Sequence, residues 1–470
     1  MDTKRLSSFI GNYWDEAILP SLAKFITIPC VTPSLNSNWK TDGHFDEAIQ
    51  LISDWINAQK LGEVKIDVLR LKDIPPCLIV DIPGDSDRTV MFYGHLDKMP
   101  GGGGWAEGLG PWHPVLKDNY LYGRGVCDDG YAAFVPIAII KALREQKISH
   151  ARCVLIFETE EESGSMNFPL ILNELHHRIG NPDLVFVLDA GGDSDQELWC
   201  CNSLRGIIVG KLTVENLKSG AHSGLAGGVV PSSFRIIRQL LSRIEDENTG
   251  EFLLPEFSTD VPKDFLKQIK AAAHVIGKEV YTVMPLLNGA KPVTEDVNEL
   301  LLNQLWRPAL SVVGAGGLPP IHEAGNVLLP KTELQLSIRI PPMVDSAIAG
   351  QKLKQVLEQD PPYGAKVEFS IDRHGIGWAA PAFEHWILED LKTASNTYFG
   401  KPTIFKGLGG AIGVVNILGQ LYPQAQFIVT GAEVPSTNAH GPNESLDIDF
   451  AKKMTCCLCE LMAKHLEARK

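Results

Sequence analysis

Cysteine is scarce in this chain and follows no repeated spacing. Nine cysteines stand among 470 residues, whereas small domains that depend on disulfides use a far higher proportion. A disulfide framework is therefore not expected. The cluster Cys456-Cys457-Leu458-Cys459 lies in a segment with the amphipathic pattern of a helix, and no second cysteine pair accompanies it. We interpret these cysteines as buried or half-buried free thiols rather than as a metal or redox site.

The chain also lacks long apolar runs and an excess of positive charge. No stretch of about 18 apolar residues occurs, which argues against a membrane-spanning helix, and the first residues, Met1–Arg5, are not those of a signal peptide. The 43 Lys and Arg against 57 Asp and Glu give a net charge of −14, which repels nucleic acids and anionic membranes. We expect a cytoplasmic protein that has neither as a partner.

What the chain does have is enough length and apolar content, 44% of 470 residues, for two hydrophobic cores. Continuous apolar runs such as Thr89–Tyr93 and Leu184–Leu188 predict strands buried on both faces of an α/β sheet. From Leu334 to Ile340, apolar and polar residues alternate instead, which predicts a sheet with one exposed face.

These two patterns divide the chain. We predict a discontinuous α/β domain over 1–205 and 379–470, with a mostly parallel central sheet flanked by helices. Between its two parts, 206–378 is predicted to form an inserted α+β domain. Helices are expected there over Ser232–Ile244, Lys263–Ile276 and Ser346–Glu358.

Several apolar runs end directly in residues that can bind metals. The run Thr89–Tyr93 is followed by His95 and Asp97, and the run Leu184–Leu188 by Asp189. The run Cys153–Phe157 is followed by Glu160, Glu161 and Glu162. Ligand sites in open α/β sheets lie beyond the carboxyl ends of the strands, so these side chains are expected to converge. One such residue is usually an ordinary loop residue, but several together favour a metal site.

The stretch Leu121–Gly130 provides the centre of this site, with the adjacent carboxylates of Asp128 and Asp129. A carboxylate can bridge two cations through its two oxygens, as a two-metal hydrolytic site requires. Asp128 is our candidate bridge, and His440 is a later candidate ligand.

Taken in order, these stretches resemble the dizinc exopeptidases of metallopeptidase family twenty, which include carnosinase, bacterial glutamate carboxypeptidase, aminoacylase and succinyl-diaminopimelate desuccinylase. The resemblance spans nearly the whole chain and is strongest to the carnosinase-like dipeptidases. It rests on Gly94–Asp97, Leu121–Asp129, Glu161–Ser165, Asp189, Gly220–Gly224 and His440–Glu444.

The resemblance implies a centre of two Zn²⁺ ions, with Mn²⁺ or Co²⁺ as alternatives. Asp128 would be shared by both metal positions. His95 and Asp189 would complete the first position, and Glu162 and His440 the second.

Two further acidic residues would assist the centre. Asp97 would accept a hydrogen bond from His95 and fix its tautomer. Glu161 would be the general base, which takes a proton from a metal-bridging water and passes it to the leaving amine. If the run Glu160–Glu162 stood alone, it would be interpreted as a solvated acidic loop.

The inserted domain would supply residues to the substrate. The resemblance implies that His222 stabilises the oxyanion, often in a neighbouring subunit, so we expect a lid that also forms a homodimer. Asn326 and Arg339 would contact the substrate. Arg339 falls on the polar face of its strand, where it can bind a carboxylate with two hydrogen bonds, and a surface ion pair is the alternative.

The chain departs from the family pattern beside the metal site and near its end. Gly130 and Tyr131 stand where Lys-Gly is common, and Leu408-Gly409-Gly410-Ala411 replaces a Glu-Gly-Gly-Ser stretch that touches the substrate carboxylate in carnosinase-like members.

We therefore predict a hydrolase, a dinuclear metallopeptidase of dipeptidase or carboxypeptidase type, that cleaves dipeptides or short peptides with a free C-terminal carboxylate. A deacylase of N-acyl amino acids is the alternative. A catalytically silent binding protein is a third reading, which the loss of Glu161 or of a metal ligand would favour, and none of these residues is lost.

Overall fold

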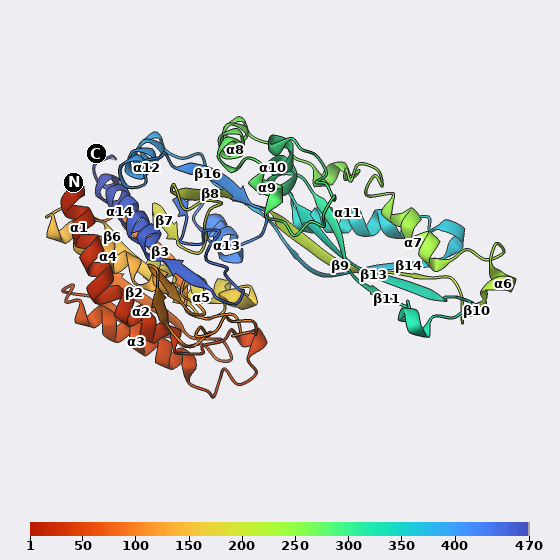
Figure 1. Ribbon diagram of the computed structural model, residues 1–470, viewed down its shortest axis with the longest axis horizontal. Coiled ribbons are helices and arrows are strands. Elements are labelled where there is room, and N and C mark those ends of the chain that lie inside the picture. Colours follow the sequence, from red (N-terminus) through yellow and green to blue (C-terminus); the bar gives the residue numbers. More distant parts are fainter. Residues whose placement is uncertain (469–470) are drawn as a thin grey trace. The chain divides into compact units, whose positions relative to one another are not determined.

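The computed structural model describes residues 1–468, which form two compact units (Figure 1). The first unit comprises Met1–Cys201, Ala380–Lys406 and the chain from Ile412 onwards, and the second comprises Asn202–Ala379 and Gly407–Ala411. No helix within 1–468 has both the length and the apolar character needed to cross a membrane.

The first unit is built on a mixed sheet with the strand order β1-β2-β6-β3-β7-β17-β8. Strands β6, β3, β7 and β17 run parallel at its centre, while β1, β2 and β8 are antiparallel to their neighbours. The bounds are β1 Lys65–Leu69, β2 Cys77–Ile82, β3 Thr89–His95, β6 Arg152–Glu158, β7 Leu184–Val187, β8 Trp199–Leu204 and β17 Gln426–Val429.

The predicted α/β class is confirmed. The sheet that we expected to be mostly parallel is parallel only at its centre. One reason is that the loop between β1 and β2 is too short for the crossover that parallel neighbours need, so these two strands pair antiparallel.

Helices with one apolar face pack around this sheet. They are α1 Thr3–Tyr13, a π-helical turn at Trp14–Ile18, α2 Leu19–Ile26, α3 His44–Ala58, α4 Val135–Glu145, α5 Phe168–Ile179, α12 His385–Tyr398, α13 Gly413–Leu421 and α14 Ile448–His465. Helices α1, α4 and α14 contact one another, which brings the first and last helices of the chain together (Figure 1). All nine cysteines are free and buried, which confirms the prediction made for Cys456, Cys457 and Cys459, and these three lie on α14.

A small sheet joins two segments that are far apart in the sequence. Its strand order is β18-β5-β4, with β4 Val115–Lys117, β5 Tyr120–Tyr122 and β18 Ser445–Asp447. Strand β5 leads into the loop that carries Asp128, and β18 follows the loop that carries His440. Because Tyr122 is the register partner of Ser445, the loop of Asp128 starts beside the point where the loop of His440 ends.

The second unit contains a four-stranded antiparallel sheet with the order β11-β13-β9-β14. Buried and less buried residues alternate along β9 and β13, and helices α7 and α11 contact strands of this sheet. The strands are β9 Gly206–Glu215, β10 Ala221–His222, β11 Ala309–Gly316, β12 Val327–Leu328, β13 Lys331–Ile340, β14 Lys366–Gly375 and β15 Trp378–Ala379, and β16 Ile404–Leu408 pairs with β8. The helices are α6 Ser223–Ala226, α7 Ser233–Leu241, α8 Lys263–Ile276, α9 Glu279–Thr282, α10 Val297–Leu305 and α11 Ser346–Glu358.

Candidate metal centre

Asp128 lies between two imidazole rings. Its Oδ1 is 3.0 Å from Nε2 of His95, and its Oδ2 is 2.9 Å from Nε2 of His440. His95 is the last residue of β3, and His440 lies in the loop before β18. The two oxygens of one carboxylate therefore face two different nitrogen ligands, which is the arrangement that a bridging carboxylate requires.

The other two predicted ligands lie beside the same rings. Oδ1 of Asp189 is 3.7 Å from Nε2 of His95, and Oε2 of Glu162 is 2.9 Å from Nε2 of His440. The five residues that the sequence singled out as ligands thus come together in the first unit, from strand ends and loops between positions 95 and 440.

Among residues 1–468, three sets of side chains offer ligand atoms that, within each set, all lie within 4.8 Å of one another. They are His95, Glu161 and Asp189; Asp128, Glu162 and His440; and Asp128, Asp189 and Glu433. The second set has the composition predicted for the second metal position. The first contains Glu161, our expected general base, and the third contains Glu433, which the sequence reasoning did not identify.

Asp97 contacts both His95 and the backbone of Glu161 and Glu162. Nδ1 of His95 is 3.0 Å from the backbone carbonyl oxygen of Asp97 and 3.4 Å from its carboxylate, so the carbonyl is the closer acceptor. A proton on Nδ1 leaves Nε2 free to bind a metal. The Asp97 carboxylate also accepts the backbone N–H groups of Glu161 and Glu162, each over 3.1 Å.

A buried ion pair, which sequence reasoning also missed, links the loops of Asp128 and His440. Nη1 of Arg124 is 2.7 Å from Oε2 of Glu444, and both side chains are almost fully buried. Arg124 also donates to the backbone carbonyl of His440, while Glu444 accepts the N–H of Gly125. The only sequence signal was that Arg124 and Glu444 stand in the same two stretches as the predicted ligands.

The electrostatics of the cluster favour a cation. Burial and the nearby Asp189 raise the pKa of Glu161 well above its usual value, and burial together with Asp128 raises the pKa of Glu162 to about 7. Burial also opposes the ionisation of Asp128, but hydrogen bonds with His440 and His95 hold its pKa below the usual value. Carboxylate oxygens and imidazole nitrogens fit Zn²⁺, Mn²⁺ and Co²⁺.

His222, Asn326 and Arg339 lie in the second unit. His222 is exposed, and its Nδ1 accepts the N–H of Gly224 over 3.1 Å, so a neutral ring carries its proton on Nε2. The backbone carbonyl of Asn326 accepts the N–H of Ser223. Arg339 is on the less buried face of β13, and its side chain forms no ion pair within 1–468. Their contacts with a substrate remain predictions.

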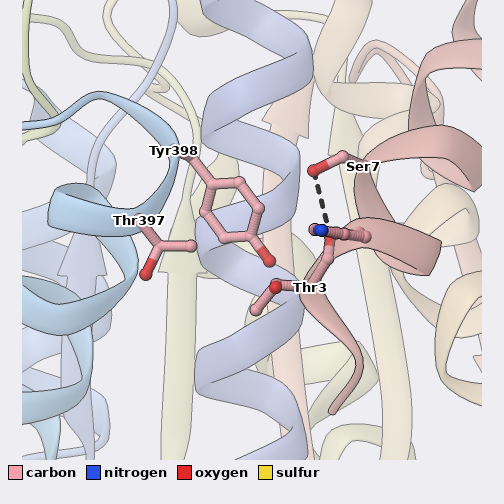
Figure 2. Close-up of a pocket in the computed structure, with 5 residues that line it drawn as sticks. Thr3, Ser7, Thr397 and Tyr398 are labelled. Carbon is pink, nitrogen blue, oxygen red and sulfur yellow. Dashed lines mark hydrogen bonds between the residues drawn. The ribbon is translucent and has the colours of Figure 1, made fainter.

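A pocket between α1 and α12 lies elsewhere in the first unit (Figure 2). Thr3, Lys4, Ser7, Thr397 and Tyr398 line it, and Ser7 donates a hydrogen bond to the backbone carbonyl of Thr3. None of these residues belongs to the three sets of possible metal ligands, so the pocket adds nothing to the candidate centre.

Comparison with known proteins gives consistent matches over most of the chain. Residues 91–464 match the family described as Peptidase family M20/M25/M40. The cysteinylglycine-S-conjugate dipeptidase of Corynebacterium striatum is 24% identical over 406 residues, which cover 84% of this chain and 85% of that protein. The Cys-Gly metallodipeptidase DUG1 of Saccharomyces cerevisiae is 25% identical over 456 residues, 91% of each chain.

A solved structure shares the fold. The crystal structure of human carnosine dipeptidase 1 aligns with a TM-score of 0.71 at 20% identity, and the alignment covers 99% of both chains.

Proposed function

This chain belongs to peptidase family M20/M25/M40 and is a hydrolase of the metallopeptidase class, and we propose that it cleaves dipeptides or short peptides that have a free C-terminal carboxylate. The observation that carries this proposal is the position of Asp128, whose two oxygens lie 3.0 Å from His95 and 2.9 Å from His440. A shared carboxylate between two nitrogen ligands is suited to two ions rather than one.

We propose Zn²⁺ at both positions, with Mn²⁺ and Co²⁺ as alternatives. His95 and Asp189 would hold one ion and Glu162 and His440 the other, with Asp128 shared. When bound, the ions would polarise the substrate carbonyl and lower the pKa of the attacking water. The raised pKa values of Glu161 and Glu162, which follow first from burial, support a site that is completed by positive charge.

Glu161 is the proposed general base. Its carboxylate would accept a proton from the attacking water and deliver it to the nitrogen of the leaving amine. The hydrogen bond from the Glu161 N–H to Asp97 supports this role, because it fixes the backbone from which the base extends. His222 would donate from Nε2 to the oxyanion that develops on the substrate.

Arg339 is the proposed partner of the substrate's terminal carboxylate, and Asn326 a second contact. A half-buried guanidinium without an ion-pair partner within 1–468 can form two parallel charge-assisted hydrogen bonds with a carboxylate. Two relatives carry names that specify Cys-Gly or a cysteinylglycine conjugate, so dipeptides with a small C-terminal residue are the first substrates to test.

A deacylase of N-acyl amino acids is the second candidate. Leu408–Ala411 favours it, because this stretch lacks the glutamate and serine side chains that a peptide-specific site can use for hydrogen bonding. Zinc-loaded protein should be assayed against a dipeptide panel that includes Cys-Gly and against a panel of N-acyl amino acids. Faster cleavage of the dipeptides is expected, and turnover of the acyl amino acids alone would replace the first proposal with the second.

We further propose a cytoplasmic homodimer formed through the second unit. The exposed position of His222 supports the dimer, since an exposed donor is available to a neighbouring subunit. Light scattering coupled to size-exclusion chromatography should give twice the chain mass, and a monomer that is fully active would contradict a role for His222 across subunits.

A further inference from the structure

Glu433 presents a carboxylate to the centre in addition to the five expected ligands and Glu161. One of its oxygens and one oxygen each of Asp128 and Asp189 lie within 4.8 Å of one another. Glu433 follows β17 in the sequence, just as Asp189 follows β7, and these two strands pair in parallel. The rule that ligands gather at strand ends therefore applies to Glu433 as well.

The backbone holds Glu433 firmly beside the segment that follows Asp189. The N–H of Glu433 donates to Ala190, and the carbonyl of Glu433 accepts the N–H of Gly192 over 2.9 Å. A side chain at Gly191 would place its Cβ 1.6 Å from the carbonyl oxygen of Glu433, so only glycine permits this approach. Asp189 and Glu433 are thus presented to the centre as a pair.

Tyr131, one of the departures from the family pattern, ties the same segments together. Its buried hydroxyl donates to the carbonyl of Leu188, next to Asp189, and accepts the N–H of Ala432, next to Glu433. Tyr131 itself follows Asp128 by three residues. One side chain therefore connects the backbone segments that carry all three carboxylates.

The Glu433 carboxylate has no hydrogen-bond or ion-pair partner among residues 1–468. A carboxylate without partners, beside two others, is costly unless a cation offsets the charge.

We propose that Glu433 is a sixth protein ligand of the metal centre and would join Asp128 and Asp189 in holding the ion at the first position. The inference rests on the proposed two-metal centre. With Glu433, the first metal position would have three carboxylates, those of Asp128, Asp189 and Glu433, and the imidazole of His95. The second position would have two carboxylates and the imidazole of His440. An oxygen-rich position suits Mn²⁺ more than Zn²⁺, which also binds nitrogen and sulfur ligands well. Loss of Glu433 should therefore weaken Mn²⁺ binding more than Zn²⁺ binding.

The test is a titration of the full-length, metal-free protein with Mn²⁺. Binding is monitored by calorimetry and by the electron paramagnetic resonance signal of free Mn²⁺. In Glu433→Gln the dissociation constant of the tighter of the two Mn²⁺-binding steps should rise by about 10- to 100-fold, the range seen when groups supporting a metal are removed. Asp195→Asn removes one charge from the loop after β7 without altering any of the three ligand sets, and it should stay within about twofold of the native constant.

Folding and the proposed centre itself are checked separately. Circular dichroism establishes that each variant is folded, and Glu433→Ala provides a second variant that should show the same loss. Native-like Mn²⁺ binding in a folded Glu433→Gln or Glu433→Ala protein would overturn the role of Glu433 alone. A native protein that binds no divalent ion would overturn the two-metal centre, and with it the proposed function.

Discussion

Oδ1 of Asp97 accepts the backbone N–H of Glu161 over 3.1 Å, and its Oδ2 accepts the N–H of Glu162 over the same distance. One fully buried carboxylate therefore orients the proposed base and a proposed ligand. Asp97→Ala should lower kcat/KM by about 10- to 100-fold, as loss of supporting partners does at metal sites. Steady-state kinetics with metal analysis test this, and an Asp97→Ala protein with native kcat/KM would contradict it.

Asp128 is expected to be required for both metal positions. Asp128→Ala removes the two oxygens that face His95 and His440, so each position loses a ligand. Elemental analysis after dialysis against metal-free buffer should find less than one ion per chain. Two tightly bound ions in the variant would rule out Asp128 as the bridge.

Substitution of the neighbours Glu161 and Glu162 should affect different properties, turnover in the first case and metal binding in the second. Glu161→Ala should keep its metals and lose turnover by about 10²- to 10⁴-fold, the usual contribution of general acid–base catalysis. Glu162→Ala should instead lose metal, because its carboxylate lies 2.9 Å from Nε2 of His440. Metal content and kcat are measured on both variants, and equal metal content with full activity in both would refute this division of roles.

Arg339 should set a preference for substrates with a free carboxylate. A charge-assisted hydrogen bond contributes about 1.5–3 kcal/mol, so native protein should favour a dipeptide over its C-terminal amide by roughly 10- to 150-fold in kcat/KM. Arg339→Ala should largely remove this preference. Lys211→Ala changes another cation on the same sheet and should preserve it, and equal rates of the native protein on acid and amide would exclude the role of Arg339.

Asp390 on α12 provides a pH prediction away from the centre. One of its buried oxygens lacks a hydrogen-bond partner within 1–468, and burial, together with Glu460, raises its pKa from 3.8 to about 6. A carboxyl group whose pKa is raised by folding favours the folded state below the unfolded pKa, and this contribution is lost as the pH rises through about 6.

Asp390→Asn should therefore raise the free energy of unfolding above pH 6 by about 1 kcal/mol, after allowance for solvent screening, and should have little effect near pH 4. Urea unfolding at the two pH values measures the difference. Glu389→Gln, at the exposed neighbouring position, serves as the control. An equal effect of Asp390→Asn at both pH values would show that ionisation of Asp390 does not matter.

The sequence by itself determined the α/β class and many of the elements. The continuous run Thr89–Tyr93 lies in β3, and the run Leu184–Leu188 contains β7 and extends one residue beyond it. A strand covered on both faces needs apolar side chains throughout. The predicted helices Lys263–Ile276 and Ser346–Glu358 have the same bounds as α8 and α11. Local patterns are sufficient for such elements, since period and end signals lie within the segment itself.

Only the tertiary structure decided which side chains meet. Arg124 and Glu444 are 320 residues apart and pair because β5 and β18 bring their loops together. Glu433 lies beside Asp189 only because β17 pairs with β7. The Asp97 carboxylate accepts the backbone N–H of Glu161, while the backbone carbonyl of Asp97 is the closer acceptor for His95. Strand order, loop paths and the choice of hydrogen-bond acceptor depend on contacts between distant segments, which no local pattern encodes.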